Sequence, residues 1–116
     1  MVANYSNTAL EGMKVLDCSQ ILAGPFCSML LADMGAEVIR IEKIDGSEDR
    51  YTIPVGEGAD GENSVGAMFL QINRNKLGMT LNPMKPKGRE IVRKLVATAD
   101  VVIANLPSPA LKTMGL

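Results

Sequence analysis

MKVLDCSQILAGPFCSMLLADMGAEVIRIE, residues 13–42, is the stretch that decides the fold class. It opens with a short apolar run at 13–17, which is typical of a buried strand. A Gly-Pro pair then suits the first turn of a helix, and the apolar segment 26–34 continues that helix up to a glycine stop. Residues 36–42 alternate and include β-branched side chains, which predicts a second strand. This order of elements predicts a βαβ unit and a right-handed parallel sheet in an α/β fold.

The rest of the chain continues the alternation of strands and helices after a long loop at 43–66. That loop is rich in glycine and charged residues and has no hydrophobic period, and loops of this length in compact domains are usually functional or mobile. The predicted elements that follow are a helix at 67–72, a strand at 79–81, a helix at 87–99, a buried strand at 100–104 and a helix from residue 110. The sequence stops barely two turns into this last helix. The helix at 26–34 is apolar around most of its circumference, so we expect it to be buried on more than one side.

Composition narrows the classes of function. The chain has 116 residues, of which 12 are basic and 13 acidic, and the basic residues are scattered. A nucleic-acid partner is therefore disfavoured, because binding phosphates along a strand needs clustered Lys and Arg. The hydrophobic content of 47% and the charged content of 22% are typical of a single globular domain.

The sequence has no histidine, and its two cysteines, Cys18 and Cys27, do not form a CxxC motif. We therefore expect no metal site and two free, buried and inert thiols of a reduced protein. Residues 1–11 lack the pattern of a signal peptide, and no apolar run approaches the roughly 20 residues that cross a bilayer. These features predict a cytoplasmic protein with no membrane partner.

Candidate ligand-binding residues lie in the loops at the carboxyl ends of the strands, where ligands bind in parallel α/β sheets. These are the loops after Asp17, Glu42, Leu81 and Ala104. The fingerprint GxGxxG is missing after the first predicted strand, and so is the phosphate loop GxxxxGK[ST], which disfavours ordinary dinucleotide and P-loop functions. Lys43, Arg74 and Lys76 are cations that could meet a phosphate, although their default state is a solvated surface charge.

Five segments together resemble the family III CoA-transferases, which include formyl-CoA transferase, carnitine CoA-transferase and α-methylacyl-CoA racemase. They occur in the family's order and spacing, at 15–17, 22–27, 31–42, 73–76 and 88–90 leading to 99–102. The resemblance runs from about residue 10 to residue 116.

The resemblance implies an enzyme that moves CoA between carboxylic acids. In this family an aspartate attacks the acyl-CoA thioester to form a mixed anhydride, and the released CoA thiolate then converts it to an aspartyl-CoA thioester. That aspartate follows the matched region, so the resemblance assigns no catalytic residue to this chain and implies that it is inactive alone. It implies a tail at 1–12 and, at 13–116, the N-terminal part of a Rossmann-like CoA-binding domain, an incomplete portion of a larger interlocked-dimer fold.

The resemblance also implies which residues contact CoA, and all of them lie at or near carboxyl ends of strands. They are Gln20, Ile21, Leu22, Ala23, Lys43, Leu81, Asn105, Leu106 and Ala110. Lys43 would meet a phosphate, Leu81 and Leu106 would flank the adenine, and the backbone near Ala23 and Asn105 would form hydrogen bonds. Gln20 would border the reacting thioester.

The substrates that the resemblance implies are CoA or acyl-CoA and a carboxylate, with no tightly bound cofactor. The expected protein partner is a second copy of the chain or a missing C-terminal portion. Two alternatives remain open: a stand-alone α/β module that binds CoA or a nucleotide, or serves as a scaffold, and a fragment of an acyl-CoA racemase of the same superfamily.

Overall fold

The computed structural model describes residues 9–52, 55–56 and 65–116. Most of the predicted tail at 1–12 and part of the predicted loop at 43–66 lie outside these ranges. The described elements, in chain order, are β1 (Lys14–Asp17), α1 (Ala23–Asp33), β2 (Glu37–Glu42), the 3-10 helix η1 (Glu48–Tyr51), β3 (Val55–Gly56), β4 (Val65–Gly66), α2 (Ala67–Ile72), β5 (Leu77–Thr80), α3 (Pro86–Val96), β6 (Val101–Ile103) and α4 (Ser108–Met114).

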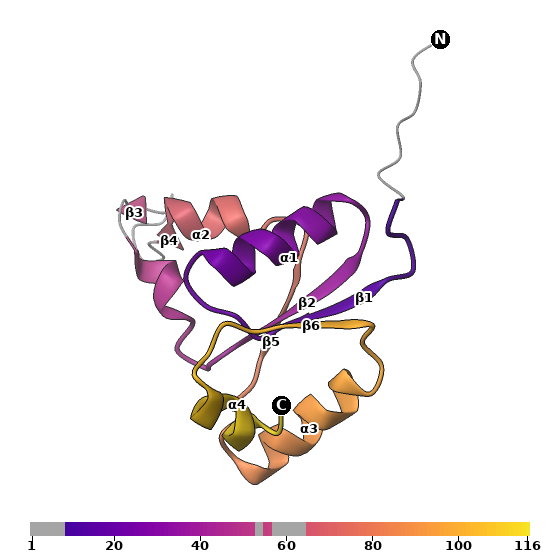
Figure 1. The fold of residues 1–116 in the computed structure, drawn as a ribbon. Helices are drawn as coiled ribbons and strands as arrows, with labels where there is room; N and C mark the ends of the chain where they lie inside the picture. The colour runs from indigo at the N-terminus through magenta and orange to yellow at the C-terminus, as the bar shows by residue number, and fades with distance from the viewer. Residues whose placement is uncertain (1–8, 53–54, 57–64) are drawn as a thin grey trace.

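The main sheet has four parallel strands in the order β5-β2-β1-β6, which confirms the predicted α/β class. Figure 1 shows α1 and α2 on one face of this sheet and α3 and α4 on the other. The short strands β3 and β4 form a separate antiparallel pair. All four strands of the main sheet therefore end at the same edge, where the predicted ligand loops begin.

The core is divided between the two faces of the sheet because successive side chains of a strand point in opposite directions. Val15 and Val38 are at most 2% exposed and pack in the cluster that also contains Ala32 of α1. Leu16, also 2% exposed, faces the other way and packs in the cluster that contains Val92 of α3. Both faces of the two central strands are thus buried, as the apolar run at 13–17 predicts for the first of them.

Several predicted features of the fold are wrong in detail. β6 is an edge strand, and Val102 is 38% exposed, so the strand is not buried on both faces. α4 ends at Met114, and Gly115 takes the left-handed conformation that commonly ends helices, with φ +87°, so the last helix does not run through the final residue. Within its described part, the long loop contains η1, β3 and β4 and is not structureless.

Helix α1 is buried on one side only within the described structure. Gly24, Ser28 and Met29 lie against the sheet, whereas Phe26 and Leu30 on the outer side are 46% and 44% exposed. The prediction of burial on more than one side is therefore wrong for the described part of the chain. None of the helices described here is long and apolar enough to cross a membrane.

Gly88 in α3 supplies a test of how closely the helix packs on the turn before it. A Cβ at this position would lie 1.9 Å from the backbone oxygen of Asn82, whereas a Cβ at Gly78 in β5 would meet nothing within 4 Å. We expect Gly88→Ala to lower the free energy of unfolding by about 3 kcal/mol, measured by urea denaturation. Gly78→Ala is the matched control and should change it by less than about 1 kcal/mol; equal effects of the two substitutions would contradict the packing.

Candidate functional site

A cavity of about 410 Å³ lies at the carboxyl ends of the parallel strands. Its lining comes from the loops that follow β1, β2 and β5 and from the segment around α4. Five of the nine predicted site residues line it: Gln20, Lys43, Leu81, Leu106 and Ala110. Residues from four separate loops therefore converge on one hollow, as the positions of the strand ends predict.

The other four predicted site residues are not part of this lining. Ile21 and Leu22 are 54% and 51% exposed, and Ala23 is the first residue of α1. Asn105 lies next to Leu106, and its side chain bonds to the backbone of Gln20. The structure thus places these four residues beside the cavity, on the turn between β1 and α1 and on the loop after β6.

Sequence reasoning missed several residues of the cavity wall. Asn82, Pro83 and Met84 directly follow the predicted third strand, so the rule of carboxyl-end loops could have found them. Ser47 could not have been found in this way, because its place depends on hydrogen bonds from its backbone N–H and its hydroxyl to the Glu42 carboxylate. The remaining missed wall residues are Cys18, Ser19, Ile41, Glu42 and Met114.

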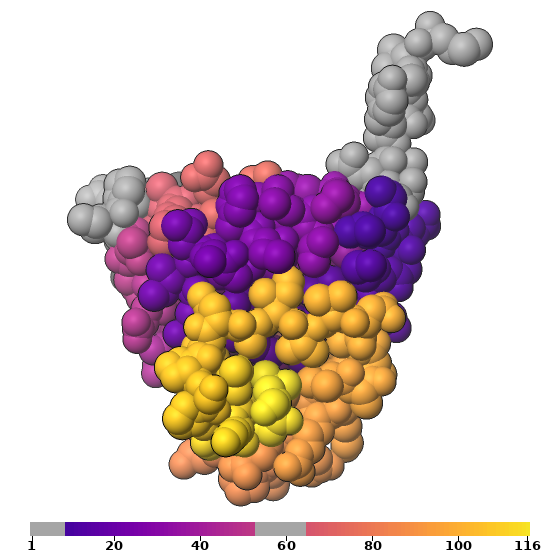
Figure 2. All heavy atoms as spheres, viewed as in Figure 1, coloured from indigo at the N-terminus to yellow at the C-terminus, as the bar shows by residue number. Residues whose placement is uncertain are grey.

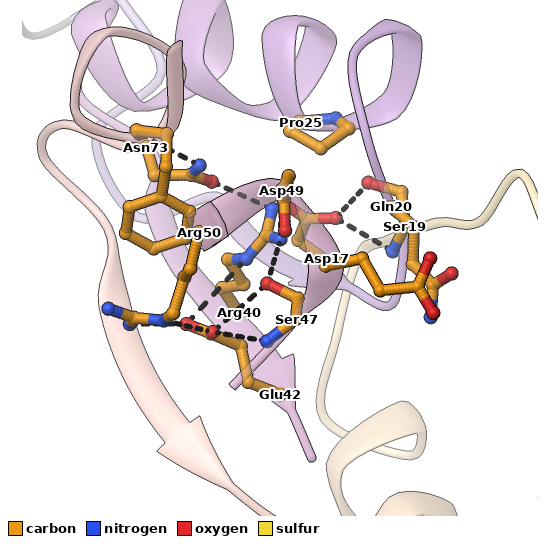
Figure 3. Close-up of polar contacts among 12 residues, drawn as sticks. Asp17, Ser19, Gln20, Pro25, Arg40, Glu42, Ser47, Asp49, Arg50 and Asn73 are labelled. Atoms are coloured by element: carbon orange, nitrogen blue, oxygen red, sulfur yellow. Dashed lines mark hydrogen bonds and ion pairs between the residues drawn. The ribbon is translucent and has the colours of Figure 1, made fainter. Parts of the chain in front are cut away.

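Beside the cavity wall, a buried carboxylate anchors the loop after β1 (Figure 3). Asp17 is fully buried and accepts hydrogen bonds from the Ser19 N–H at 3.0 Å, from the Ser19 hydroxyl and from the Ser28 hydroxyl at 2.5 Å. The Lys76 ammonium completes the set at 3.0 Å from Asp17 Oδ2. The end of β1, helix α1 and the segment before β5 are joined through this one side chain.

Lys76 is buried, so the view of it as a solvated surface charge is wrong. Its side chain is 2% exposed. Besides Asp17, its Nζ donates to the carbonyl oxygen of Pro25 at 2.8 Å and to Oδ1 of Asn73 at 2.8 Å, so all three N–H groups have acceptors. Arg74, another candidate for a phosphate, is paired with Asp33 instead. Neither cation lines the cavity.

Arg40 extends the buried network to the segment after β2. It is 1% exposed and donates to Asp49 at 2.6 Å, to the Ser47 hydroxyl at 3.0 Å and to Asn73 at 2.7 Å. Its guanidinium carbon lies 5.4 Å from the centroid of the Phe69 ring. The first part of the long loop is thereby fixed against the sheet and α2 (Figure 3).

Arg50 neutralises the buried carboxylate of Glu42, which lines the cavity. Its Nε and Nη2 donate to the two carboxylate oxygens at 2.6 and 2.8 Å, a bidentate arrangement. Its guanidinium carbon lies 4.0 Å from the centroid of the Phe69 ring, on which Arg40 also stacks. Glu42 is therefore already paired and does not present a free negative charge to the cavity.

The buried carboxylates of Asp17 and Glu42 keep their charge at neutral pH. Burial raises the pKa of Asp17, but the hydrogen bonds from Ser19 and Ser28 and the charge of Lys76 outweigh it and hold that pKa below the ordinary aspartate value. The pKa of Glu42 is likewise lowered, because the bonds from Arg50 and Ser47 outweigh its burial. Lys76 has a lowered pKa because its burial is only partly offset by Asp17.

The cavity is suited to binding rather than to nucleophilic attack by its thiol. Burial and the nearby charge of Asp17 raise the pKa of Cys18 to about 12, so the thiol is neutral and unreactive. Both cysteines are free; Cys18 is buried as expected, whereas Cys27 is exposed, so the expectation of a buried thiol is wrong for Cys27. Among the described residues no group of three metal-ligating side chains occurs. The walls combine apolar side chains with polar ones, and Lys43, with a side chain 55% exposed, supplies a cation at the edge.

The ion pair between Asp17 and Lys76 is tested by Lys76→Met, which keeps the length of the side chain and removes its charge. We expect the free energy of unfolding to fall by about 3 to 5 kcal/mol, because the buried Asp17 loses its nearest counter-charge, and Arg40, 3.8 Å away, is already paired with Asp49. Lys94→Met is the matched control, since the Lys94–Glu90 pair is exposed to solvent and contributes little. Urea denaturation with Lys76→Met as stable as the unsubstituted chain would contradict the role of the pair.

The lowered pKa values of Asp17 and Glu42 predict a loss of stability in acid. Because both carboxylates bind protons less readily in the folded than in the unfolded chain, the unfolding free energy rises with pH through their titration range. We expect it to be level near neutral pH and to fall progressively below about pH 5. Urea midpoints at a series of pH values measure this. Since buried pairs are screened little, the fall should persist in high salt; a flat profile from neutral pH into acid would overturn it.

Comparison with known proteins identifies relatives of this chain. The family model described as CoA-transferase family III matches residues 10–116. The succinate–glutarate CoA-transferase of Agrobacterium fabrum is 41% identical over 109 residues, which cover 92% of this chain and 27% of that protein. The human succinyl-CoA:glutarate CoA-transferase is 39% identical over 107 residues, again 92% of this chain and 24% of that protein.

A solved structure gives the same relationship. The crystal structure of a CAIB/BAIF family protein from Brucella suis superimposes with a TM-score of 0.84 at 41% sequence identity, covering 96% of this chain and 29% of that one. The chain thus spans about a quarter of the length of the curated relatives that it matches. The match of the family model over residues 10–116 and the structural similarity of the parallel α/β sheet lead to the same conclusion. The chain belongs to CoA-transferase family III.

Proposed function

We propose that residues 13–116 form the N-terminal CoA-binding portion of a family III CoA-transferase. The observation that carries this proposal is the convergence of Gln20, Lys43, Leu81, Leu106 and Ala110 on one cavity at the carboxyl ends of the strands. These residues come from loops far apart in the sequence, and a nucleotide-like ligand in a parallel α/β sheet binds at this edge. The names of the relatives, which are CoA-transferases, support the same ligand.

The chemistry of the cavity fits parts of CoA. Its aliphatic walls at Leu81 and Leu106 suit the faces of the adenine ring, and Lys43 places a positive charge where a phosphate would reach solvent. CoA and acyl-CoA enter as substrates, and a carboxylic acid is the second substrate, as in the named reactions of the relatives. No resident cofactor takes part in the proposed reaction.

The nucleophile of the proposed reaction comes from outside this chain. Transfer of CoA between carboxylic acids needs a carboxylate that can attack a thioester and carry the acyl group as an anhydride. Asp17 and Asp49 are fully buried and paired with Lys76 and Arg40, so neither is free to attack. We therefore propose that this portion binds CoA, and that a further portion of the same enzyme supplies the catalytic aspartate in the cytoplasm.

Calorimetric titration of the chain with CoA tests the proposed ligand. We expect saturable binding, weakened about five- to tenfold by Lys43→Ala, because the substitution removes a charged partner of a phosphate. The loss should shrink as salt is added, since Lys43 is exposed and its interactions are screened. Lys87→Ala on α3, outside the cavity lining, is the control and should bind normally.

Absence of binding at millimolar CoA would contradict the proposed function. It would favour the alternative of a stand-alone α/β scaffold without this ligand. If the Lys43→Ala variant and the unsubstituted chain bind CoA with equal affinity, CoA remains the proposed ligand but the proposed role of Lys43 is contradicted.

The outer side of α1 provides a surface for the proposed assembly. Apolar residues recur every fourth position there, and side chains spaced in this way share one face of a helix. They are Leu22, Phe26, Leu30 and Met34, which are 51%, 46%, 44% and 42% exposed. Figure 2 shows the atoms of this helix at the surface of the molecule. We propose that this face is covered by a second copy or by another portion of the enzyme.

Size-exclusion chromatography with light scattering tests this surface on the isolated chain. We expect the unsubstituted chain to self-associate as its concentration rises, because an apolar face of this kind is rarely left open to water. The double substitution Phe26→Ser and Leu30→Ser should shift it toward the monomer without changing its helical circular dichroism. The proposal would be contradicted if the unsubstituted chain stays monomeric and unfolds cooperatively at high concentration.

A further inference from the structure

Two hydrogen bonds join the loop after β1 to the loop after β6. The backbone N–H of Gln20 donates to Oδ1 of Asn105 at 2.8 Å, and Nδ2 of Asn105 donates to the carbonyl oxygen of Gln20 at 2.8 Å. The side-chain amide of Asn105 therefore engages both backbone groups of one residue. It continues the parallel ladder beyond its last backbone rung, in which the N–H of Cys18 donates to the carbonyl oxygen of Ile103 at 2.9 Å.

The backbone immediately after this pair of bonds is held in an unfavourable conformation. Ile21 has φ +67°, and this left-handed region is unfavourable for a β-branched residue. Its side chain is 54% exposed, so tertiary packing around it does not compensate for the strain. A conformation of this kind persists only where neighbouring contacts hold it, and the two bonds to Gln20 are the contacts that lie next to it.

Close packing on the other side of the turn restricts it further. A Cβ at Gly24 would lie 2.2 Å from the Cβ of Ser19 and 3.6 Å from Cγ of Asn105. The start of α1 thus lies directly against Ser19, whose hydroxyl and N–H are fixed by Asp17. The turn is held from within by Asp17 and from the neighbouring loop by Asn105.

We propose that Asn105 is a positioning residue whose side-chain amide sets the conformation of the Gln20–Ala23 turn at the edge of the cavity. Gln20 lines the cavity from β1, and Leu106, the neighbour of Asn105, lines it from β6. The two hydrogen bonds between Asn105 and Gln20, which we call the clamp, fix these two walls relative to each other before a ligand binds. The contribution to ligand binding rests on the proposed function, whereas the clamp itself does not.

The first experiment measures the clamp without any ligand, by NMR exchange of the Gln20 amide proton in the full chain. We expect Asn105→Ala to accelerate this exchange about fivefold, since the amide loses its acceptor. Asn105→Asp keeps an acceptor for the Gln20 N–H but loses the donor to the Gln20 carbonyl oxygen, so its exchange rate should lie between those of the unsubstituted chain and Asn105→Ala. Thr98→Ala is the matched control, because the Thr98 hydroxyl donates to the carbonyl oxygen of Leu95 at the end of α3, outside the cavity lining. It should leave the exchange of Gln20 unchanged.

The second experiment measures CoA affinity by calorimetry for the same variants. We expect Asn105→Ala to weaken binding about five- to tenfold while its circular dichroism stays that of the unsubstituted chain. Equal exchange of the Gln20 amide in the unsubstituted chain and in Asn105→Ala would overturn the clamp. Accelerated exchange with unchanged affinity would overturn its role in binding. If the unsubstituted chain binds no CoA but its Gln20 exchange responds as stated, the proposed function fails and the clamp stands.

Discussion

The buried ion pair between Asp17 and Lys76 is the contact on which the walls of the cavity depend. Asp17 ends β1, and Lys76 precedes β5, so the pair joins segments separated by 59 positions in the sequence. The same ammonium also binds the carbonyl oxygen of Pro25 in the first turn of α1, and the same carboxylate holds Ser19 next to the cavity. A sheet edge, a helix start and a ligand loop therefore take their relative positions from one pair of charges.

Arg40 and Glu42 extend the buried network to the segment after β2. Their partners Ser47, Asp49 and Arg50 all come from that segment, and Ser47 and Glu42 then appear in the cavity wall. Within the network, Asp17 is paired with Lys76, Glu42 with Arg50, and Asp49 with Arg40. Buried pairs of this kind contribute little net stability relative to apolar residues, but loss of one partner is costly. The network therefore specifies geometry, and its cations are paired within it. Lys43, whose ammonium lies 3.9 Å from the exposed carboxylate of Glu48, is the cation of the cavity wall.

The sequence pattern predicts the elements of the fold well, because both faces of a parallel sheet require apolar runs and helices require an apolar stripe. The helix at 67–72 agrees with α2, and the loops at the strand ends do surround a cavity. The burial of Lys76 and Arg40 could not be predicted, since nothing local distinguishes a buried cation from a solvated one. Their burial follows from acceptors supplied by distant segments. The end of α4 could have been predicted from Gly115, because glycine commonly follows the last residue of a helix.

Mapping CoA on the chain by backbone amide NMR tests most directly that the cavity at the strand ends is the CoA site. Binding there predicts that the largest shifts on titration occur at Gln20, Lys43, Leu81 and Leu106, which line the cavity from four loops. The amides of Leu95 and Thr98, beside a smaller hollow at the amino ends of β1 and β2, should stay unchanged. Shifts confined to that smaller hollow or to the outer face of α1, or no shifts at all, would contradict the assignment of the site.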